Sequence, residues 1–303
     1  MTDAWTVGHV TVDDVVFHDG RTAMHSIGGA TVYAAVGAAV TGRRLGVVTR
    51  IGSDFPASAL DPLRDSDIEV METSIPHRCL WQWALYEEDG SRTFLPHPST
   101  GTYAENSPRV GEGPPWDAVP ALHVAPMPVR HQRPWVEAAH AAGVPVTMDP
   151  HHDSSRDDPD ELWALIPGLR AFLPSMLEAE RIHGPDPEAA AQACVEAGAE
   201  VVAVKIGEDG SIVATREGTW HVPACSVELV DPTGAGDAYC GAFSAALAAG
   251  CDALQAARTG TVAASLTVER FGALAPLGAA DAGEIARRLA TVRPRPLRAV
   301  ANR

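Results

Sequence analysis

The strongest chemical signal in the sequence is VELVDPTGAGDAYCGAFSAALAAG, residues 227–250. A strand-like start leads through an Asp-Pro-Thr turn into Gly234-Ala235-Gly236, after which Asp237 opens an alanine-rich helix. A glycine turn at a helix N-terminus directs unpaired N–H groups outward and adds the positive end of the helix dipole, which together bind an anion. If that anion is a phosphoryl group in transfer, the three amides stabilise its charge and Asp237 accepts the proton of the attacking hydroxyl.

The same residues also permit a plainer interpretation, in which Asp237 only favours the dipole of a well-capped helix. A short glycine motif does not by itself separate the two interpretations. The motif is not a Walker loop, because no Gly-Lys-Ser/Thr follows the glycines.

Four stretches together resemble the ribokinase-like (phosphofructokinase B) family of sugar and nucleoside kinases. The Asp-Pro-Thr-Gly-Ala-Gly-Asp-Ala-Tyr-x-Gly-Ala-Phe run is similar to its C-terminal signature, and Gly28-Gly29-Ala30 with the following Tyr33-Ala34-Ala35 resembles its N-terminal one. VVAVKIGEDGSIV at 201–213 and AASLTVERFGALAPL at 263–277 resemble the strand and the closing helix beside the nucleotide. The resemblance therefore spans nearly the whole chain.

This resemblance implies one domain over residues 1–303 with a doubly wound, mostly parallel sheet flanked by helices and a small β lid. It implies an ATP-dependent kinase that phosphorylates a hydroxyl of a small sugar or polyol, with Asp237 as general base and residues 234–236 as anion hole. A nucleoside kinase of the same family, with the base held by Tyr33, Trp81 or Trp83, is the alternative. A non-catalytic sugar or nucleotide sensor is disfavoured, since the base and the glycines are retained.

The resemblance also assigns roles to further residues, by position in the matched motifs. The acceptor is expected at Asp13, Gly28, Gly29 and Tyr33; ATP at Lys205, Gly207, Gly210 and Thr233; Mg²⁺, through water, at Glu178; and a monovalent cation such as K⁺ at Asp231 and Thr233. Four of them have a structural alternative: Asp13 as a solvated turn carboxylate, Lys205 as a surface charge, Glu178 as a first-turn helix acid and Asp231 as a turn cap.

Two departures from the family pattern bear on these roles. The Asn-x-x-Glu motif associated with Mg²⁺ reads Ser175-Met176-Leu177-Glu178, so only the glutamate is kept. Where ribokinases have Lys and Asn after the glycine pair, this chain has Ala30 and Tyr33, which argues against ribose itself as the acceptor.

The elements that must position these residues alternate between strands and helices, which predicts βαβ units. Residues 80–95 instead alternate about Asp89-Gly90, which predicts a hairpin with Trp81 and Trp83 on one face and Gln82 and Ala84 on the other. With residues 11–27 it would form the lid. The remaining predictions are strands at 5–10, 45–49, 144–148, 170–173 and 201–204, helices at 31–40, 134–142, 187–196 and 238–249, loops at 108–120 and 151–160, and a flexible basic tail over 292–303.

Composition limits the partners. A formal net charge of -16 over 303 residues argues against nucleic acid and anionic lipid, because Lys and Arg dominate binding to both. Five scattered cysteines without a C-x-x-C pair indicate neither a zinc site nor disulfides, and no segment reads as a leader or membrane span. We therefore expect a cytoplasmic enzyme with a small-molecule acceptor, with a homodimer left open.

Overall fold

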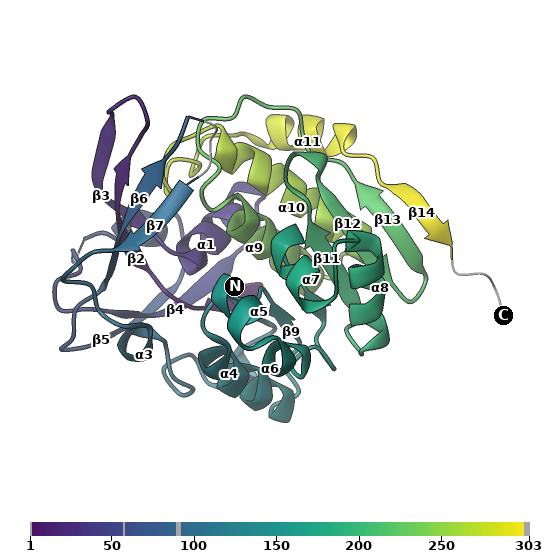
Figure 1. Cartoon of the computed structure of the whole chain (residues 1–303), viewed down its shortest axis with the longest axis horizontal. Helices are drawn as coiled ribbons and strands as arrows, with labels where there is room; N and C mark the ends of the chain where they lie inside the picture. Colours follow the sequence, from purple (N-terminus) through teal and green to yellow (C-terminus); the bar gives the residue numbers. More distant parts are fainter. Residues whose placement is uncertain (1, 57, 89–91, 300–303) are drawn as a thin grey trace.

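A ten-stranded sheet forms the centre of the molecule (Figure 1). The computed structural model describes residues 2–56, 58–88 and 92–299. The strand order is β14-β13-β12-β11-β10-β9-β8-β1-β4-β5, and the run from β11 to β5 is parallel throughout. The bounds are β1 Ala4–Val7, β4 Leu45–Ile51, β5 Val70–Ser74, β8 Leu122–Val124, β9 Val146–Met148, β10 Ala171–Phe172, β11 Val201–Lys205, β12 Ser211–Thr215, β13 Gly218–Val222 and β14 Arg295–Ala299.

Helices cover both faces of this sheet, as the strand alternation requires. In β11, Val201 and Ala203 belong to the core formed with α1 (Ala30–Val40), α9 (Ala235–Ala248) and α10 (Ala253–Val268). Val202 and Val204 point the other way, into the core formed with α4 (Val129–Ala141), α6 (Pro159–Trp163), α7 (Met176–Ile182) and α8 (Pro187–Glu196). The doubly wound α/β prediction is therefore confirmed.

The remaining helices lie in the connections and along the edges. They are α2 Asp61–Asp65, α3 Tyr103–Asn106, α5 His152–Asp157 and α11 Ala282–Thr291, with 3₁₀ turns η1 Trp116–Ala118 and η2 Gly207–Asp209. Within the described parts of the chain, no helix has the length and apolar character needed to cross a membrane.

A second sheet, of four strands, stands at one end of the molecule (left in Figure 1). Its order is β3 (Thr22–Gly28), β2 (Thr11–Val16), β6 (Leu80–Tyr86) and β7 (Arg92–Pro96). β6 and β7 pair antiparallel, while Asp89 and Gly90, the expected turn between them, lie outside the described residues. We call this four-stranded unit the lid sheet.

Four local predictions are wrong. The strand-like start expected at 227–230 forms no strand, and its Leu229 and Val230 are exposed instead of packed in a sheet. The stretch 151–160, read as a loop for its polar residues, contains α5 and the start of α6, both with acidic residues in the first turn. Of the segment 292–303, expected to be a flexible tail, the described part starts with the buried Val292 and continues as β14, which pairs antiparallel with β13; residues 300–303 lie outside the described residues. The helix expected to start at Pro134 begins at Val129, because Val129 and Gln132 are buried on the same side as Trp135, Val136 and Ala139.

Candidate active site

The start of α9 is fixed by close packing against α1. Gly234 caps the helix with a left-handed φ of 72°, and a Cβ there would lie 2.1 Å from the Tyr33 ring. A Cβ on Gly37 would lie 2.3 Å from the carbonyl oxygen of Ala238. Both contacts require glycine, since any side chain would push the helices apart. The first-turn N–H groups of α9, which have no partner inside the helix, are thereby held in place.

Two cavities adjoin at this helix start. One, of about 530 Å³, lies under the lid sheet and is lined by Gly234, Gly236 and Asp237; we call it the lid cavity. The other, of about 600 Å³, runs along α9 and α10 and is lined by Ala235 and Gly236; we call it the helix cavity. Lys205, Gly207, Pro232 and Gly236 line both. A group bound in one cavity can therefore reach a group bound in the other at the first turn of α9.

Asp13 and Gln82 present polar atoms to the lid cavity from neighbouring strands of the lid sheet. Gln82 Nε2 donates to Asp13 Oδ1 at 3.0 Å. Burial raises the pKa of the Asp13 carboxyl to about 6, although the hydrogen bonds it accepts lower it. Gly28 makes room for this carboxyl, because a Cβ there would lie 2.1 Å from Asp13 Oδ2. Such a carboxylate can hold the hydroxyls of an acceptor.

Aromatic rings form much of the remaining wall of the lid cavity. Phe94 from β7 and Tyr103 from α3 line it and remain 42% and 39% exposed. The Tyr103 ring packs between those of His9 and His151, at 5.2 and 5.5 Å. Burial lowers the pKa of His9 to about 3, so this imidazole is neutral near pH 7. The cavity therefore offers apolar ring faces without positive charge from His9.

The two tryptophans of β6 do not line either cavity. Trp81 stacks on His97 with ring centroids 4.8 Å apart and donates Nε1–H to Asp14 Oδ2 at 2.8 Å, on the face opposite Gln82. Trp83 packs near the same His97 ring. Of the rings considered as base contacts, only Tyr33 lines the cavity, and it is buried against Gly234.

A buried ion pair lies beneath the point where the cavities meet. Lys205 Nζ donates to Asp149 Oδ2 at 2.8 Å, and Cys240 Sγ lies 3.2 Å from both atoms. Burial works against the charge on Lys205, but Asp149 and its neighbours hold the pKa of Lys205 well above its ordinary value. Burial raises the pKa of the Asp149 carboxyl to about 7, against the lowering effect of Lys205. A positive charge therefore stands directly beside Gly236 at the helix start.

Glu178 serves as a helix cap and also lines the lid cavity. Its Oε2 accepts the N–H of Ser175 at 2.7 Å, and Ser175 Oγ accepts the N–H of Glu178, which together form a capping box for α7. Both Glu178 and Asp149 face the lid cavity, and the described residues hold no cluster of three or more metal-ligating side chains. Mg²⁺, which retains most of its waters, fits such a pair of carboxylates.

Asp231 lies beneath the helix start with both carboxylate oxygens engaged. Oδ1 accepts the hydroxyl of Tyr86 at 2.6 Å and the N–H of Thr233 at 2.9 Å, while Oδ2 accepts the N–H of Gly272 at 3.4 Å. The Thr233 hydroxyl is also hydrogen-bonded to Tyr86. Three donor hydrogens therefore point at this carboxylate, and the Tyr86 hydroxyl occupies the place between Asp231 and Thr233 where a monovalent cation was expected, so these side chains do not fit that cation.

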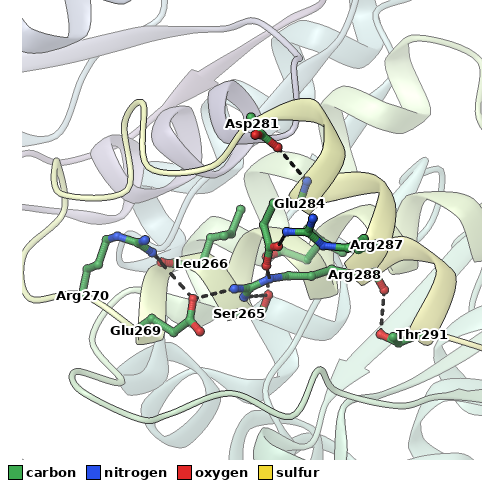
Figure 2. A network of polar contacts seen from close by, with 10 residues as sticks. Ser265, Leu266, Glu269, Arg270, Asp281, Glu284, Arg287, Arg288 and Thr291 are labelled. Carbon is green, nitrogen blue, oxygen red and sulfur yellow. Dashed lines mark hydrogen bonds and ion pairs between the residues drawn. The ribbon is translucent and has the colours of Figure 1, made fainter.

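The helix cavity is braced from outside by α11. Ser265 of α10 lines the cavity, and its Oγ accepts a hydrogen bond of 2.9 Å from Arg288 of α11. Figure 2 shows Arg288 reaching Glu269 and Glu284 as well, at 2.7 and 2.6 Å. Its side chain is 15% exposed, so this network is partly shielded from water and holds α11 against α10.

The structure brings most of the expected residues together, with some differences of place. Asp13, Gly29, Tyr33, Glu178, Thr233, Gly234, Gly236 and Asp237 line the lid cavity; Ala235 and Gly210 line the helix cavity; Lys205 and Gly207 line both. Thr233, expected at ATP, lines the lid cavity and not the helix cavity. Asp231 and Gly28 are not among the residues that line either cavity. Asp149 was missed, although it follows directly on a predicted strand, at the sheet edge where ligands of α/β folds bind.

A family model for pfkB family carbohydrate kinases matches residues 1–280. The chain belongs to this family. A curated relative, the cytidine kinase of Thermococcus kodakarensis, is 30% identical over 282 residues, which cover 90% of this chain and 98% of the relative. As a pfkB-family member, the chain is a phosphotransferase with an alcohol group as acceptor.

Solved structures agree on the fold. The Burkholderia thailandensis nucleoside kinase in complex with inosine gives a TM-score of 0.78 at 19% identity and covers 96% of this chain and 98% of its own. A putative ribokinase II from E. coli in complex with ATP and Mg²⁺ gives 0.76 at 21% identity, with 96% and 99% covered. At these identities the two structures support a shared ribokinase-like fold.

Proposed function

We propose that this pfkB-family member is a nucleoside kinase, which transfers the γ-phosphoryl group of ATP to a hydroxyl of a nucleoside bound in the lid cavity. The observation that carries the proposal is the first turn of α9, with Asp237, at the junction of two cavities of suitable size. Phosphoryl transfer needs donor and acceptor to meet at an anion-stabilising group beside a base.

In this arrangement ATP occupies the helix cavity, with its phosphates along the Gly207–Gly210 turn and Lys205. The N–H groups at the start of α9 stabilise the charge of the transferred group, and Asp237 accepts the proton of the attacking hydroxyl. Mg²⁺ brought with ATP neutralises phosphate charge, and Glu178 and Asp149 would hold it through water.

The walls of the lid cavity favour a nucleoside over a free sugar. Asp13 and Gln82 supply hydrogen-bonding groups for sugar hydroxyls, which either acceptor would use. Phe94 and Tyr103 add half-exposed ring faces, which a planar base can stack on and a free sugar would leave largely uncovered. The full-length similarity to a cytidine kinase points to the same class.

A panel of acceptors tests the proposal by ADP release. Cytidine, uridine, adenosine and inosine should give higher kcat/KM than ribose, fructose or a polyol, by at least about fivefold for the preferred nucleoside, since one base stack contributes about 1–3 kcal/mol. A free sugar with higher kcat/KM than every nucleoside would overturn the nucleoside assignment. No ADP release with any hydroxyl acceptor would overturn the kinase site.

Two alanine variants test where the nucleobase of the acceptor binds. Phe94→Ala and Tyr103→Ala should each raise KM for the nucleoside roughly fivefold or more, with ATP affinity unchanged, because neither residue lines the helix cavity. Leu95→Ala is the matched control: Leu95 is similarly exposed on the same strand but does not line either cavity. Equal effects of the Phe94 and Leu95 changes would contradict the placement.

A further inference from the structure

Tyr86, the last residue of β6, connects the lid sheet to the loop before α9. Its hydroxyl donates to Asp231 Oδ1 at 2.6 Å and hydrogen-bonds the hydroxyl of Thr233. Asp231 is only 2% exposed and also accepts the N–H of Gly272. The single carboxylate therefore joins three segments that are far apart in sequence: the lid strand, the turn before Gly234 and the loop after α10.

Apolar contacts seat the same end of the lid sheet on the same loop. Phe17, which directly follows β2, has its ring centroid 5.2 Å from that of Tyr86 and 5.1 Å from that of Phe271. Val15 and Ala84 complete this small cluster, which is separate from the two large cores. The polar contact of Tyr86 is thus shielded by packing, and a shielded hydrogen bond to a carboxylate is stronger than an exposed one.

We propose that Tyr86 is a positioning residue that ties the lid sheet to the anion-binding turn, and that its hydroxyl takes the place of a monovalent cation beside Asp231. β6 carries Gln82 to the acceptor side of the lid cavity and Tyr86 to Asp231, so one strand relates the acceptor to the helix start. Turnover then depends on the lid contact and not on K⁺.

The catalytic consequence rests on the proposed kinase function, whereas the lid contact does not. Loss of the hydroxyl should raise KM for the acceptor and lower kcat. The affinity for ATP should stay the same, because none of the described residues of the lid sheet lines the helix cavity. A residue needed only for folding would not separate the two substrates in this way.

The test is Tyr86→Phe, which keeps the ring and its packing on Phe17. Amide hydrogen exchange should become roughly ten- to a hundredfold faster in β2 and β6, the range expected when a hydrogen bond to a charged group is lost from a local opening equilibrium. Tyr239→Phe is the matched control: it removes a buried tyrosine hydroxyl that bonds Ser211 at 3.0 Å and lies in α9 rather than in the lid sheet, and it should leave exchange in the lid sheet unchanged.

The proposal that the Tyr86 hydroxyl replaces a monovalent cation is tested on the unmodified protein in sodium, potassium and tetramethylammonium salts. Rates and thermal midpoints should be equal in all three. Unchanged lid exchange in Tyr86→Phe, or a midpoint that rises in potassium alone, would overturn the proposal. If the unmodified protein releases no ADP with any acceptor, that result counts against the proposed kinase function instead. Amide hydrogen exchange and the thermal midpoint test the Tyr86 proposal without any measurement of turnover.

Discussion

Replacing Asp237 by Asn should abolish phosphoryl transfer while ATP binding and folding remain nearly intact. Asp237 is the third residue of α9 and lines the lid cavity but not the helix cavity. Asparagine keeps the size of the side chain and removes its ability to take a hydroxyl proton. Loss of a general base costs about two to four orders of magnitude in rate, and we expect kcat to fall by that factor.

The expected cost in stability is small by comparison. A negative charge in the first turn of a helix contributes about 0.3–1 kcal/mol through the dipole, and less when it is partly exposed to salt. For a chain of this length that corresponds to a shift of at most about 4 °C in the thermal midpoint. ATP affinity should change by less than about tenfold, because Lys205, Gly207 and Gly236 remain in place.

Turnover, ATP titration and thermal midpoint measured on one preparation separate the two roles of Asp237. Asp252→Asn is the matched control, since Asp252 starts α10 as its N-cap, accepting the N–H of Gln255 at 2.7 Å, and lies outside both cavities. It should leave kcat unchanged. If Asp237→Asn keeps near-native turnover and only lowers the midpoint, Asp237 is a helix acid and the reasoning fails.

Three further outcomes can be measured. Because burial raises the pKa of Asp13 from 3.8 to about 6, kcat/KM for the acceptor should fall about tenfold per pH unit below pH 6, and Asp13→Asn should remove this limb of the profile. Gly234→Ala should lower both the thermal midpoint and kcat, whereas Gly250→Ala, with a φ of 87° but open space around it, should lower only the midpoint. Arg288→Ala should destabilise the chain by about 1–3 kcal/mol and weaken ATP binding, while Arg287→Ala, at a side chain 74% exposed, should do neither; equal denaturation curves for the two would contradict the bracing role of α11.

The sequence was sufficient where a local pattern carried the information. The glycines and Asp237 define a turn and a helix start within one short segment, and the alternation in β6 places Gln82 on the opposite face from Trp81. The structure shows both features, whereas the strand expected before Asp231 does not form, because Leu229 and Val230 are exposed and lie in neither sheet. A local pattern can also mislead: the composition of 151–160 is typical of a loop, but the short helix α5, capped by His151, and the start of α6 form there next to α7.

Contacts between distant segments carry what the sequence could not show. Tyr86 meets Asp231 across 145 positions, and Lys205 meets Asp149 across 56. The sequence around Asp231 does not show whether its carboxylate faces a cation or a tyrosine hydroxyl, because the contacting residue, Tyr86, comes from β6 in the lid sheet. The turn before α9 therefore depends on a support that comes from β6, and the Tyr86 hydroxyl is where that dependence can be measured in this chain.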